Sequence, residues 1–230
     1  MKLIDFHAHI LPRLDHGSRS SQISMNQLCL IHGAGVDTVC ATSHFYPQEV
    51  LVDHFLEARD AAFARLLEVV GDMPRPKVIL GAEVLICEGL DRMEGLERLC
   101  LEGTDFLLLE MPFAASAWNQ RLYQTVADIA ERGIRPVFAH VDRYPHKLVE
   151  QLFEMGFTAQ LNVSSLDRFF KPKHLMRWME EGVITALGSD LHGDSEEGYH
   201  TYVKVCSMLK EQTAHIMAET EQMLSSAVRR

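Results

Sequence analysis

The chain has 230 residues, of which 47% are hydrophobic and 23% are charged, and its formal net charge is −10. This composition is that of a globular protein long enough to bury a core, and the acidic balance argues against a nucleic-acid-binding surface, which needs a basic face. A phosphorylated substrate remains compatible with the charge, because bound divalent cations supply positive charge that the residue count omits.

The five cysteines are scattered and form no Cys-x-x-Cys pair, which predicts reduced thiols. The N-terminus has no basic segment followed by a long apolar run, because Asp5, His7 and His9 interrupt it. No later stretch approaches the roughly 18 apolar residues of a membrane span. We therefore expect a cytoplasmic protein without membrane insertion.

Apolar runs alternate with helical periodicity along most of the chain. In chain order, the first half predicts a strand at 3–6, a helix at 23–32, a strand at 36–42, a helix at 54–70, a strand at 77–80 and a short helix at 96–101. The second half predicts strands at 106–109, 136–139, 158–163 and 183–187, which alternate with helices at 119–132, 147–155 and 174–181 and precede two final helical stretches.

Seven near-continuous apolar strands, each followed by a helical segment, indicate an α/β fold with a parallel sheet covered by helices. An open doubly wound sheet and a closed barrel both satisfy this periodicity. The chain shows no linker, low-complexity segment or repeat, so we expect a single domain over residues 1–230.

Polar side chains at the strand ends favour the barrel. His7 and His9 stand at i and i+2, which places both imidazoles on one side of a strand, and Asp190 and His192 repeat this spacing after the last strand. A closed βα barrel gathers the carboxyl ends of its first and last strands at one face, whereas an open sheet separates its edges. The strand-end candidates are His7, His9, Asp15 or His16, His44, Glu83, Glu110, His140, Asp190 and His192.

Taken singly, each of these side chains is more simply explained as solvated or capping. Together, carboxylates clustered at one barrel face are costly without cations, and imidazoles with carboxylates but no thiolates suit Zn²⁺, Mn²⁺ or Fe²⁺. The set exceeds the needs of one ion, so the pattern predicts two or three metals. Such a site activates water and clamps an anionic group in transfer, which makes hydrolysis of a phosphate ester the expected reaction.

The cysteines narrow the class of phosphatase. The residues six positions after them are Gly35, Tyr46, Met93, Phe106 and Gln212, so the Cys-x5-Arg loop of thiolate phosphatases is absent. Metal-bound water, not sulfur, is the predicted nucleophile.

The ordered motifs resemble those of the polymerase and histidinol phosphatase (PHP) superfamily. Within it, the chain is most similar to the CpsB-like bacterial tyrosine-protein phosphatases of capsular and exopolysaccharide operons. The resemblance extends from residue 1 to about residue 193, on His7-Ala-His9, Asp15-His16-Gly17, Ala41-Thr-Ser-His44, Gly81-Ala-Glu83, Leu109-Glu110, Ala139-His140-Val-Asp-Arg143-Tyr144, Leu161-Asn162-Val-Ser-Ser165 and Gly188-Ser-Asp190-Leu-His192.

The resemblance implies a distorted seven-stranded, TIM-barrel-like (β/α) barrel with three divalent metal ions, Mn, Fe or Zn. It implies three ligand sets: His7, His9, Glu83 and Asp190 for one metal; Glu83, Glu110 and His140 for a second; and the residue before Gly17 with His44 and His192 for the third. The resemblance also implies that Arg143 holds the substrate phosphate; the alternative is a surface ion pair with Asp142. A flanking histidine or aspartate, with His44 and His192 as the candidates, is the expected proton donor to the leaving group.

Two segments of the chain depart from the family pattern. His16 stands where the subfamily usually has aspartate, so we expect His16 to bind metal, with Asp15 nearby as support or substitute. An acidic loop, 193–197, stands where the subfamily often has an arginine. Its negative charge would repel an anionic phosphopeptide or select a different one, so the prediction of phosphoester hydrolysis is broader than that of phosphotyrosine as the substrate.

The leading hypothesis is a protein-tyrosine phosphatase that acts on a phosphotyrosine-bearing protein, such as a tyrosine kinase controlling polysaccharide export. The alternatives are a phosphatase for a small metabolite such as histidinol phosphate, against which Glu110 argues, and a non-catalytic metal-binding barrel, against which the complete ligand set argues.

Overall fold

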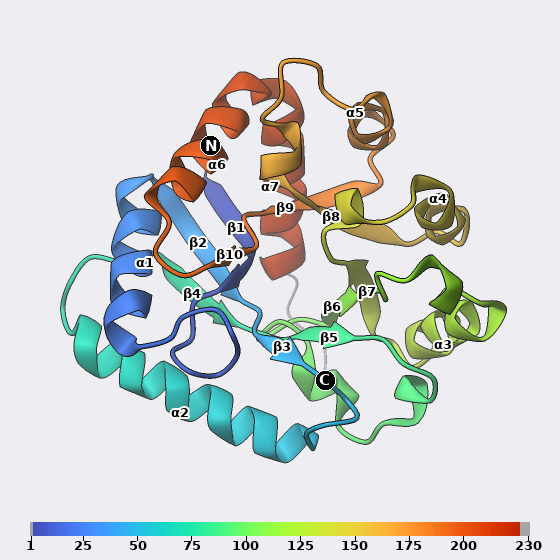
Figure 1. The fold of residues 1–230 in the computed structure, drawn as a ribbon, viewed down its shortest axis with the longest axis horizontal. Helices are drawn as coiled ribbons and strands as arrows, with labels where there is room; N and C mark the ends of the chain where they lie inside the picture. Colours follow the sequence, from blue (N-terminus) through green and yellow to red (C-terminus); the bar gives the residue numbers. More distant parts are fainter. Residues whose placement is uncertain (1, 226–230) are drawn as a thin grey trace.

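Short parallel strands lie at the centre of the molecule and helices cover them (Figure 1). The computed structural model describes residues 2–225. Its strands are β1 (Leu3–His9), β2 (Val36–Ala41), β3 (His44–Phe45), β4 (Lys77–Leu80), β5 (Glu83–Leu85), β6 (Phe106–Glu110), β7 (Arg135–Phe138), β8 (Thr158–Asn162), β9 (Ile184–Gly188) and β10 (Leu191–His192).

The strands form two parallel sheets, with the orders β10-β1-β2-β4 and β3-β5-β6-β7-β8-β9. Three of the predicted strands are each followed by a second short strand that was not predicted, because β3 follows β2, β5 follows β4 and β10 follows β9 after breaks of two residues. The parallel α/β architecture is therefore confirmed, whereas one closed sheet of seven strands is not what the hydrogen bonds describe. At the last break Asp190 has φ of 54°, which an extended strand cannot accommodate.

The helices lie outside the strands, with α1 and α2 on one side and α3, α4 and α5 on the other (Figure 1). The predicted helices agree with the structure to within a few residues, except that 96–101 is a short 3₁₀ turn. The α-helices are α1 (Ser21–Gly33), α2 (Val52–Val70), α3 (Gln120–Glu131), α4 (His146–Glu154), α5 (Lys173–Glu180), α6 (Glu196–Met208) and α7 (Lys210–Ser225). The 3₁₀ helices are η1 (Leu90–Arg92), η2 (Leu96–Leu99), η3 (Ala115–Ala117), η4 (Val141–Arg143) and η5 (Val163–Leu166).

Local capping explains where several helices begin. The side chain of Ser20 accepts a hydrogen bond from the backbone N–H of Ile23, which satisfies one of the unpaired donors at the start of α1. Asn119 caps α3 in the same way, and Ser195 caps α6. Helix α2 ends at Gly71, whose positive φ of 54° is readily available to glycine.

Apolar side chains from both sheets and from the helices make up the core, and Phe6, Phe45 and Phe138 within it are fully buried. Few of the buried side chains are carboxylates or imidazoles, and all of these except Asp5 belong to the candidate site: His7, His9, Glu83, Glu110 and His140. Burial of so many ionisable groups is costly unless they are paired or bind metals.

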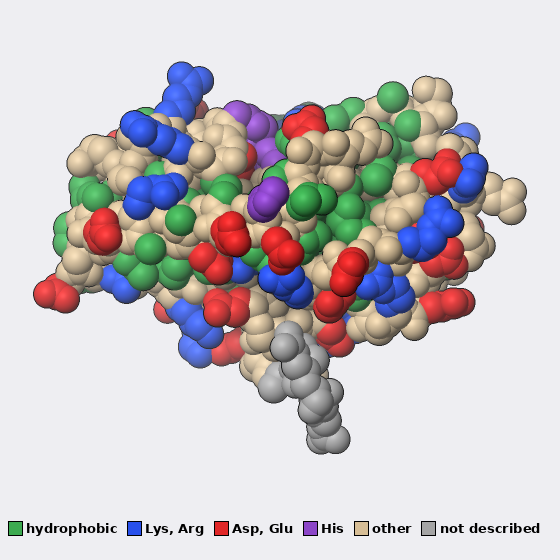
Figure 2. Space-filling model, turned by 90° about the horizontal axis from the view of Figure 1, so that it is seen from below, with side chains coloured by type: hydrophobic (Ala, Val, Ile, Leu, Met, Phe, Trp, Pro, Cys, Tyr) green, Lys and Arg blue, Asp and Glu red, His purple; other side chains and the backbone are tan. Residues whose placement is uncertain are grey.

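The charges on the surface and the apolar character of the helices relate to two expectations, that the protein binds no nucleic acid and does not insert into a membrane. On the face shown in Figure 2, acidic and basic side chains are interspersed, and histidines gather near its upper edge. Within residues 2–225, no helix combines the length and the apolar character needed to cross a membrane.

Candidate metal centre

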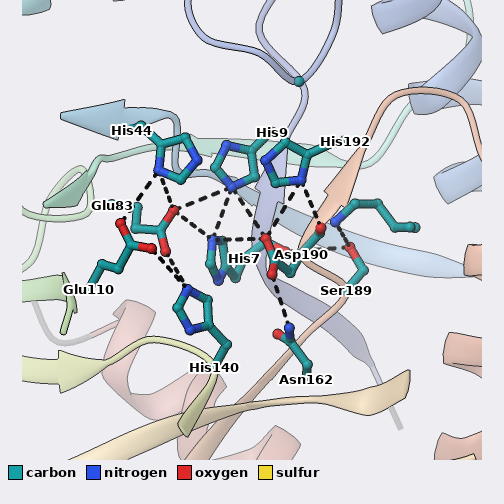
Figure 3. A network of polar contacts seen from close by, with 12 residues as sticks. His7, His9, His44, Glu83, Glu110, His140, Asn162, Ser189, Asp190 and His192 are labelled. Atoms are coloured by element: carbon teal, nitrogen blue, oxygen red, sulfur yellow. Dashed lines mark hydrogen bonds and ion pairs between the residues drawn. The ribbon is translucent and has the colours of Figure 1, made fainter. Parts of the chain in front are cut away.

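Most of the predicted site residues converge at the carboxyl ends of the strands, as Figure 3 shows. Parallel strands all end at the same edge, so polar residues at their carboxyl ends converge although they are far apart in sequence. The contributors are His7 and His9 of β1, His44 of β3, Glu83 of β5, Glu110 of β6, His140 after β7, Asp190 between β9 and β10, and His192 of β10.

Glu83 lies at the centre of this group and is fully buried. Its Oε2 atom is 2.9 Å from Nδ1 of His44, 3.3 Å from Nε2 of His7 and 3.4 Å from Nε2 of His9. Its Oε1 atom is 2.8 Å from Nε2 of His140. One carboxylate therefore faces four imidazoles, which is the arrangement expected of a bridging ligand.

Glu83 and Asp190 lie on opposite sides of His7 and His9 (Figure 3). The Oδ1 atom of Asp190 is 3.6 Å from Nε2 of His7 and 3.4 Å from Nε2 of His9. Its Oδ2 atom accepts hydrogen bonds of 3.0 Å from Nη1 of Arg143 and from Nδ2 of Asn162. Asp190 thus joins the metal-ligand candidates to the predicted phosphate-binding arginine.

The outer part of the site is a group of stacked imidazoles. The ring centroids of His9 and His192 are 3.8 Å apart, and the exposed ring of His16 lies 4.7 Å from His44 and 4.5 Å from His192. Burial and the neighbouring charge of His9 lower the pKa of His192 to about 4. Its imidazole is therefore neutral near pH 7, as a metal ligand must be.

Asp15 has a supporting position. Its Oδ2 atom accepts hydrogen bonds from Nδ1 of His9 at 2.8 Å and from the backbone N–H of His44 at 3.1 Å, while Oδ1 accepts one from the N–H of Gly17. Asp15 orients one candidate ligand and fixes the loop that carries His16.

The donor set fits divalent cations. Within residues 2–225, three groups of side chains bring their ligand atoms within 4.8 Å of one another: His7, His9 and Asp190; His44, Glu83 and Glu110; and His9, His44 and His192. Two buried atoms of the cluster, Nδ1 of His44 and Oε2 of Glu83, lie 2.9 Å apart but are not aligned for a hydrogen bond, so neither has a hydrogen-bond partner. Buried polar atoms without partners are costly, and coordination to a metal ion removes that cost.

The pKa values of His7, Glu83 and Glu110 are shifted by burial and by the charges of their neighbours in the cluster. Burial lowers the pKa of His7, but the charges of Glu83 and Asp190 outweigh it and raise the pKa to about 8. Burial favours the neutral form of Glu83, yet His7 and the other imidazoles hold its pKa well below the usual range. Burial and then the charge of Glu83 raise the pKa of Glu110. Two carboxylates that repel in this way are stabilised by a shared cation.

Strained backbone accompanies the ligand candidates. His140 and Asp190 have positive φ values of 33° and 54°, a region that costs non-glycine residues about 1–3 kcal/mol. The backbone N–H of Asp190 donates to the carbonyl of His7 at 2.7 Å, which holds it in this conformation. The loop after β1 packs so closely on the strand that a Cβ at Gly17 would lie 2.5 Å from the Cβ of His9.

Two amide side chains that the sequence did not predict as site residues support the cluster. Oε1 of Gln160 accepts from the backbone N–H of His140 at 2.7 Å and lies 3.2 Å from Nδ1 of His7. Its Nε2 atom donates to Oδ1 of Asn162, whose own amide donates to Asp190. The available signal was the i, i+2 spacing of two amides on β8, the same spacing as the histidines of β1.

A second support is Asp5, which is fully buried on β1. It accepts hydrogen bonds from the backbone N–H and the hydroxyl of Ser189, at 2.8 and 2.6 Å, and from the N–H of His7 at 3.3 Å. Burial raises its pKa to about 6. Asp5 therefore ties the first strand to the turn that presents Asp190.

Arg143 points toward the site from η4, and its side chain is 46% exposed. Besides Asp190, it contacts Phe113, whose ring centroid is 4.8 Å from the guanidinium carbon. Its ion pair is thus with Asp190, not with Asp142, whose carboxylate accepts the backbone N–H of Asn162.

The chain is similar to known proteins over most of its length. The sequence model of the family described as capsular polysaccharide synthesis, CpsB/CapC, matches residues 3–225. The tyrosine-protein phosphatase CpsB of Streptococcus pneumoniae is 28% identical over 218 residues, which cover 86% of each chain. The tyrosine-protein phosphatase YwqE of Bacillus subtilis is 27% identical over 239 residues, which cover 96% of this chain and 91% of that one.

Solved structures are also similar to this chain. One from a study of YwqE of Bacillus subtilis and CpsB of Streptococcus pneumoniae, described as unique metal-dependent tyrosine phosphatases, aligns with a TM-score of 0.79 at 26% identity. It covers 98% of this chain and 96% of that one. A TatD family hydrolase of Entamoeba histolytica aligns with a TM-score of 0.58 at 8% identity, which shows a common fold alone. The predicted resemblance is confirmed, and the chain belongs to the CpsB/CapC family of capsular polysaccharide synthesis proteins.

Proposed function

We propose that this protein is a metal-dependent protein-tyrosine phosphatase, which hydrolyses phosphotyrosine to tyrosine and phosphate and is linked to capsular or exopolysaccharide synthesis. The observation that carries the proposal is the convergence of five strand-end histidines with Glu83, Glu110 and Asp190 in one partly buried cluster. The relatives named as metal-dependent tyrosine phosphatases support the same activity.

We assign the cluster to three divalent ions, Mn, Fe or Zn. His7, His9, Glu83 and Asp190 would hold one ion, and Glu83, Glu110 and His140 a second. His44 and His192 would hold the third, with His16 at the exposed side and Asp15 as support. When bound, such ions activate water for attack on phosphorus and stabilise the charge of the transferring phosphoryl group.

The remaining steps belong to the side chains of this chain. The Arg143 guanidinium, oriented by Asp190 and Phe113, binds two oxygens of the phosphate. As the bond between phosphorus and the tyrosine oxygen breaks, that oxygen takes up a proton, for which His44 and His192 are the candidate donors. His192 is the more accessible of the two, with 27% of its side chain exposed against 8% for His44, but because its imidazole is neutral near pH 7 it would relay a proton taken from solvent.

We further propose that residues 1–230 form one catalytic domain, a distorted seven-stranded barrel like a TIM barrel. The break between β9 and β10 supports this proposal, because β9 pairs with β8 in one sheet and β10 pairs with β1 in the other. We place the protein in the cytoplasm, with a phosphotyrosine-bearing protein, such as a bacterial tyrosine kinase, as its substrate.

The decisive experiment compares metal-loaded and metal-stripped protein on a phosphotyrosine peptide, on histidinol phosphate and on an aryl phosphate. We expect metal-dependent phosphate release from the peptide and the aryl phosphate. A preference for histidinol phosphate would support the small-metabolite alternative, and failure on all three substrates would leave only a metal-binding barrel. A metal-edge anomalous scattering scan of crystals would identify the ions and count them.

Substitution of Glu83 tests the assignment of the bridging ligand. We expect Glu83→Gln, which keeps the volume and removes the charge, to lower metal content and to abolish hydrolysis. Glu57 is an exposed glutamate of α2, so Glu57→Gln is a matched control that should leave both unchanged. Full activity of Glu83→Gln would refute the assignment.

A further inference from the structure

A hollow of about 470 Å³ opens beside the metal centre and is lined mainly by apolar side chains. Its walls are formed chiefly by Tyr46, Pro47, Leu85, Ile86, Pro112 and Phe113. These residues end or follow β3, β5 and β6, which are neighbours in one sheet. The carboxylate of Glu110, at the end of β6, also lines the hollow, so the hollow adjoins the metal centre.

Two aromatic rings flank the hollow, and each stacks on a candidate ligand. The ring of Tyr46 is 5.4 Å from that of His44, with 16° between the planes. The ring of Phe113 is 5.8 Å from that of His140, with 15° between the planes. Tyr46 and Phe113 therefore each stack directly on a side chain that would hold a metal ion.

Phe113 is held in place although 53% of it is exposed. The indole N–H of Trp118 donates to the carbonyl of Pro112 at 2.6 Å, and the N–H of Met111 donates to the hydroxyl of Tyr144 at 3.0 Å. The Phe113 ring also lies 5.7 Å from the ring of Tyr144. Phe113 adjoins the other apolar side chains of the hollow, and an apolar patch beside polar residues is typical of a ligand-binding surface.

A second hollow, of about 740 Å³, lies on the Asp190 side of the centre, and its lining is of a different kind. Polar and charged groups predominate there, among them His16, Asp142, Asn162, Ser164 and Glu197. An aromatic ring buries its faces favourably between aromatic and aliphatic walls but not against carboxylates. The two hollows therefore suit different parts of one substrate.

We propose that the hollow between Tyr46 and Phe113, which we call the aryl cleft, receives the phenyl ring of the substrate phosphotyrosine. The inference rests on the proposed function, because the phosphate of that residue would lie at the metal centre. Arg143 lines the second hollow, and its guanidinium carbon is 4.8 Å from the Phe113 ring, so Phe113 borders both the cleft and the arginine that would bind the phosphate. The cleft selects aryl over alkyl phosphoesters, since an alkyl group leaves both aromatic walls without a partner.

The test measures inhibition by two compounds that share a phosphonate and differ in the group attached to it. Phenylphosphonate and methylphosphonate compete with para-nitrophenyl phosphate in the metal-loaded, full-length protein. We expect wild type to bind phenylphosphonate more tightly, and Phe113→Ala to reduce that preference about 5- to 10-fold. Phe113→Leu should retain part of the preference. Phe169→Ala is the matched control, because Phe169 is an exposed phenylalanine on another loop.

A second variant fills the cleft instead of opening it. Cys87 is half-buried in the cleft wall, and Cys87→Trp should weaken phenylphosphonate about tenfold or more while methylphosphonate inhibits as before. Thermal unfolding of each variant checks that the fold is retained.

The outcomes separate the cleft from the activity. Equal weakening of both inhibitors by Phe113→Ala would show that Phe113 acts only by supporting Arg143, and would overturn the aryl cleft. An unchanged preference in both Phe113→Ala and Cys87→Trp would overturn it too. If metal-loaded wild type hydrolyses no phosphoester at all, the proposed function fails and the cleft fails with it.

Discussion

Nδ1 of His9 donates a hydrogen bond of 2.8 Å to Oδ2 of Asp15. This bond fixes the tautomer of the imidazole and leaves Nε2 facing His7, Glu83 and Asp190. Carboxylates that hold a ligand histidine in this way orient the ring and strengthen it as a donor. The turn that carries Asp15 therefore contributes to the metal centre even where its carboxylate is not a ligand.

Loss of Asp15 should weaken metal binding without emptying the site at once. We expect Asp15→Ala to lower metal affinity about 10- to 100-fold, because His9 loses its orienting partner. Equilibrium dialysis followed by elemental analysis measures the change. Asp60→Ala, which removes an exposed aspartate of α2, serves as the control. An affinity equal to that of wild type would show that the hydrogen bond has no role in the site.

His16 offers a test of the outermost metal. Its ring stacks against those of His44 and His192 and is exposed, so its removal disturbs little of the core. We expect His16→Ala to lose about one metal ion per chain and His16→Asp to retain it, because imidazole and carboxylate both bind these metals. Metal content identical in the three proteins would exclude His16 as a ligand.

Arg143 should act on the phosphate and not on metal content. We expect Arg143→Ala to lower kcat/KM for an aryl phosphate about 100-fold, as when one donor to a developing charge is removed. Arg143→Lys keeps the charge but loses the bidentate geometry, so its activity should be intermediate. Arg121→Ala, which breaks an exposed ion pair with Glu88, is the control. If Arg143→Ala instead depletes the metals, its role is to hold Asp190.

The amide of Gln160 should matter for stability as well as for the site. Gln160→Leu replaces the amide by an apolar side chain of similar size and leaves the buried N–H of His140 and the amide oxygen of Asn162 with fewer partners. We expect the free energy of unfolding to fall by about 1–3 kcal/mol in denaturant titrations. Gln22→Leu, on the exposed side of α1, should change it much less. Equal stability of the two variants would contradict the buried network.

Thiol alkylation distinguishes this chemistry from that of thiolate phosphatases. Cys29 is exposed, whereas Cys40, Cys100 and Cys206 are buried, and burial raises the pKa of Cys100 and of Cys206 to about 12. Iodoacetamide near pH 7 should therefore modify Cys29 first and leave hydrolysis intact, since no thiolate is the nucleophile. Mass spectrometry locates the label. Inactivation that keeps pace with labelling, and that Cys29→Ser prevents, would be evidence for a reactive thiol.

The sequence by itself determined the alternation of strands and helices and the identity of the strand-end residues. Both follow from local rules, because an apolar run needs a buried strand and amphipathic periodicity needs a helix. The convergence of His7, His44, Glu83 and His140 followed too, since parallel strands place their carboxyl ends at one edge.

Only the tertiary structure decided the finer arrangement. The division into two sheets depends on breaks such as the one at Asp190, where a positive φ interrupts the last strand. The different positions of Asp15 and His16 depend on how one loop packs on β1, and no local pattern encodes a difference of a few ångströms between neighbouring residues. Phe113 became part of the site only through its contacts with His140 and Arg143, which lie about thirty residues away in the sequence and meet it only in the folded chain.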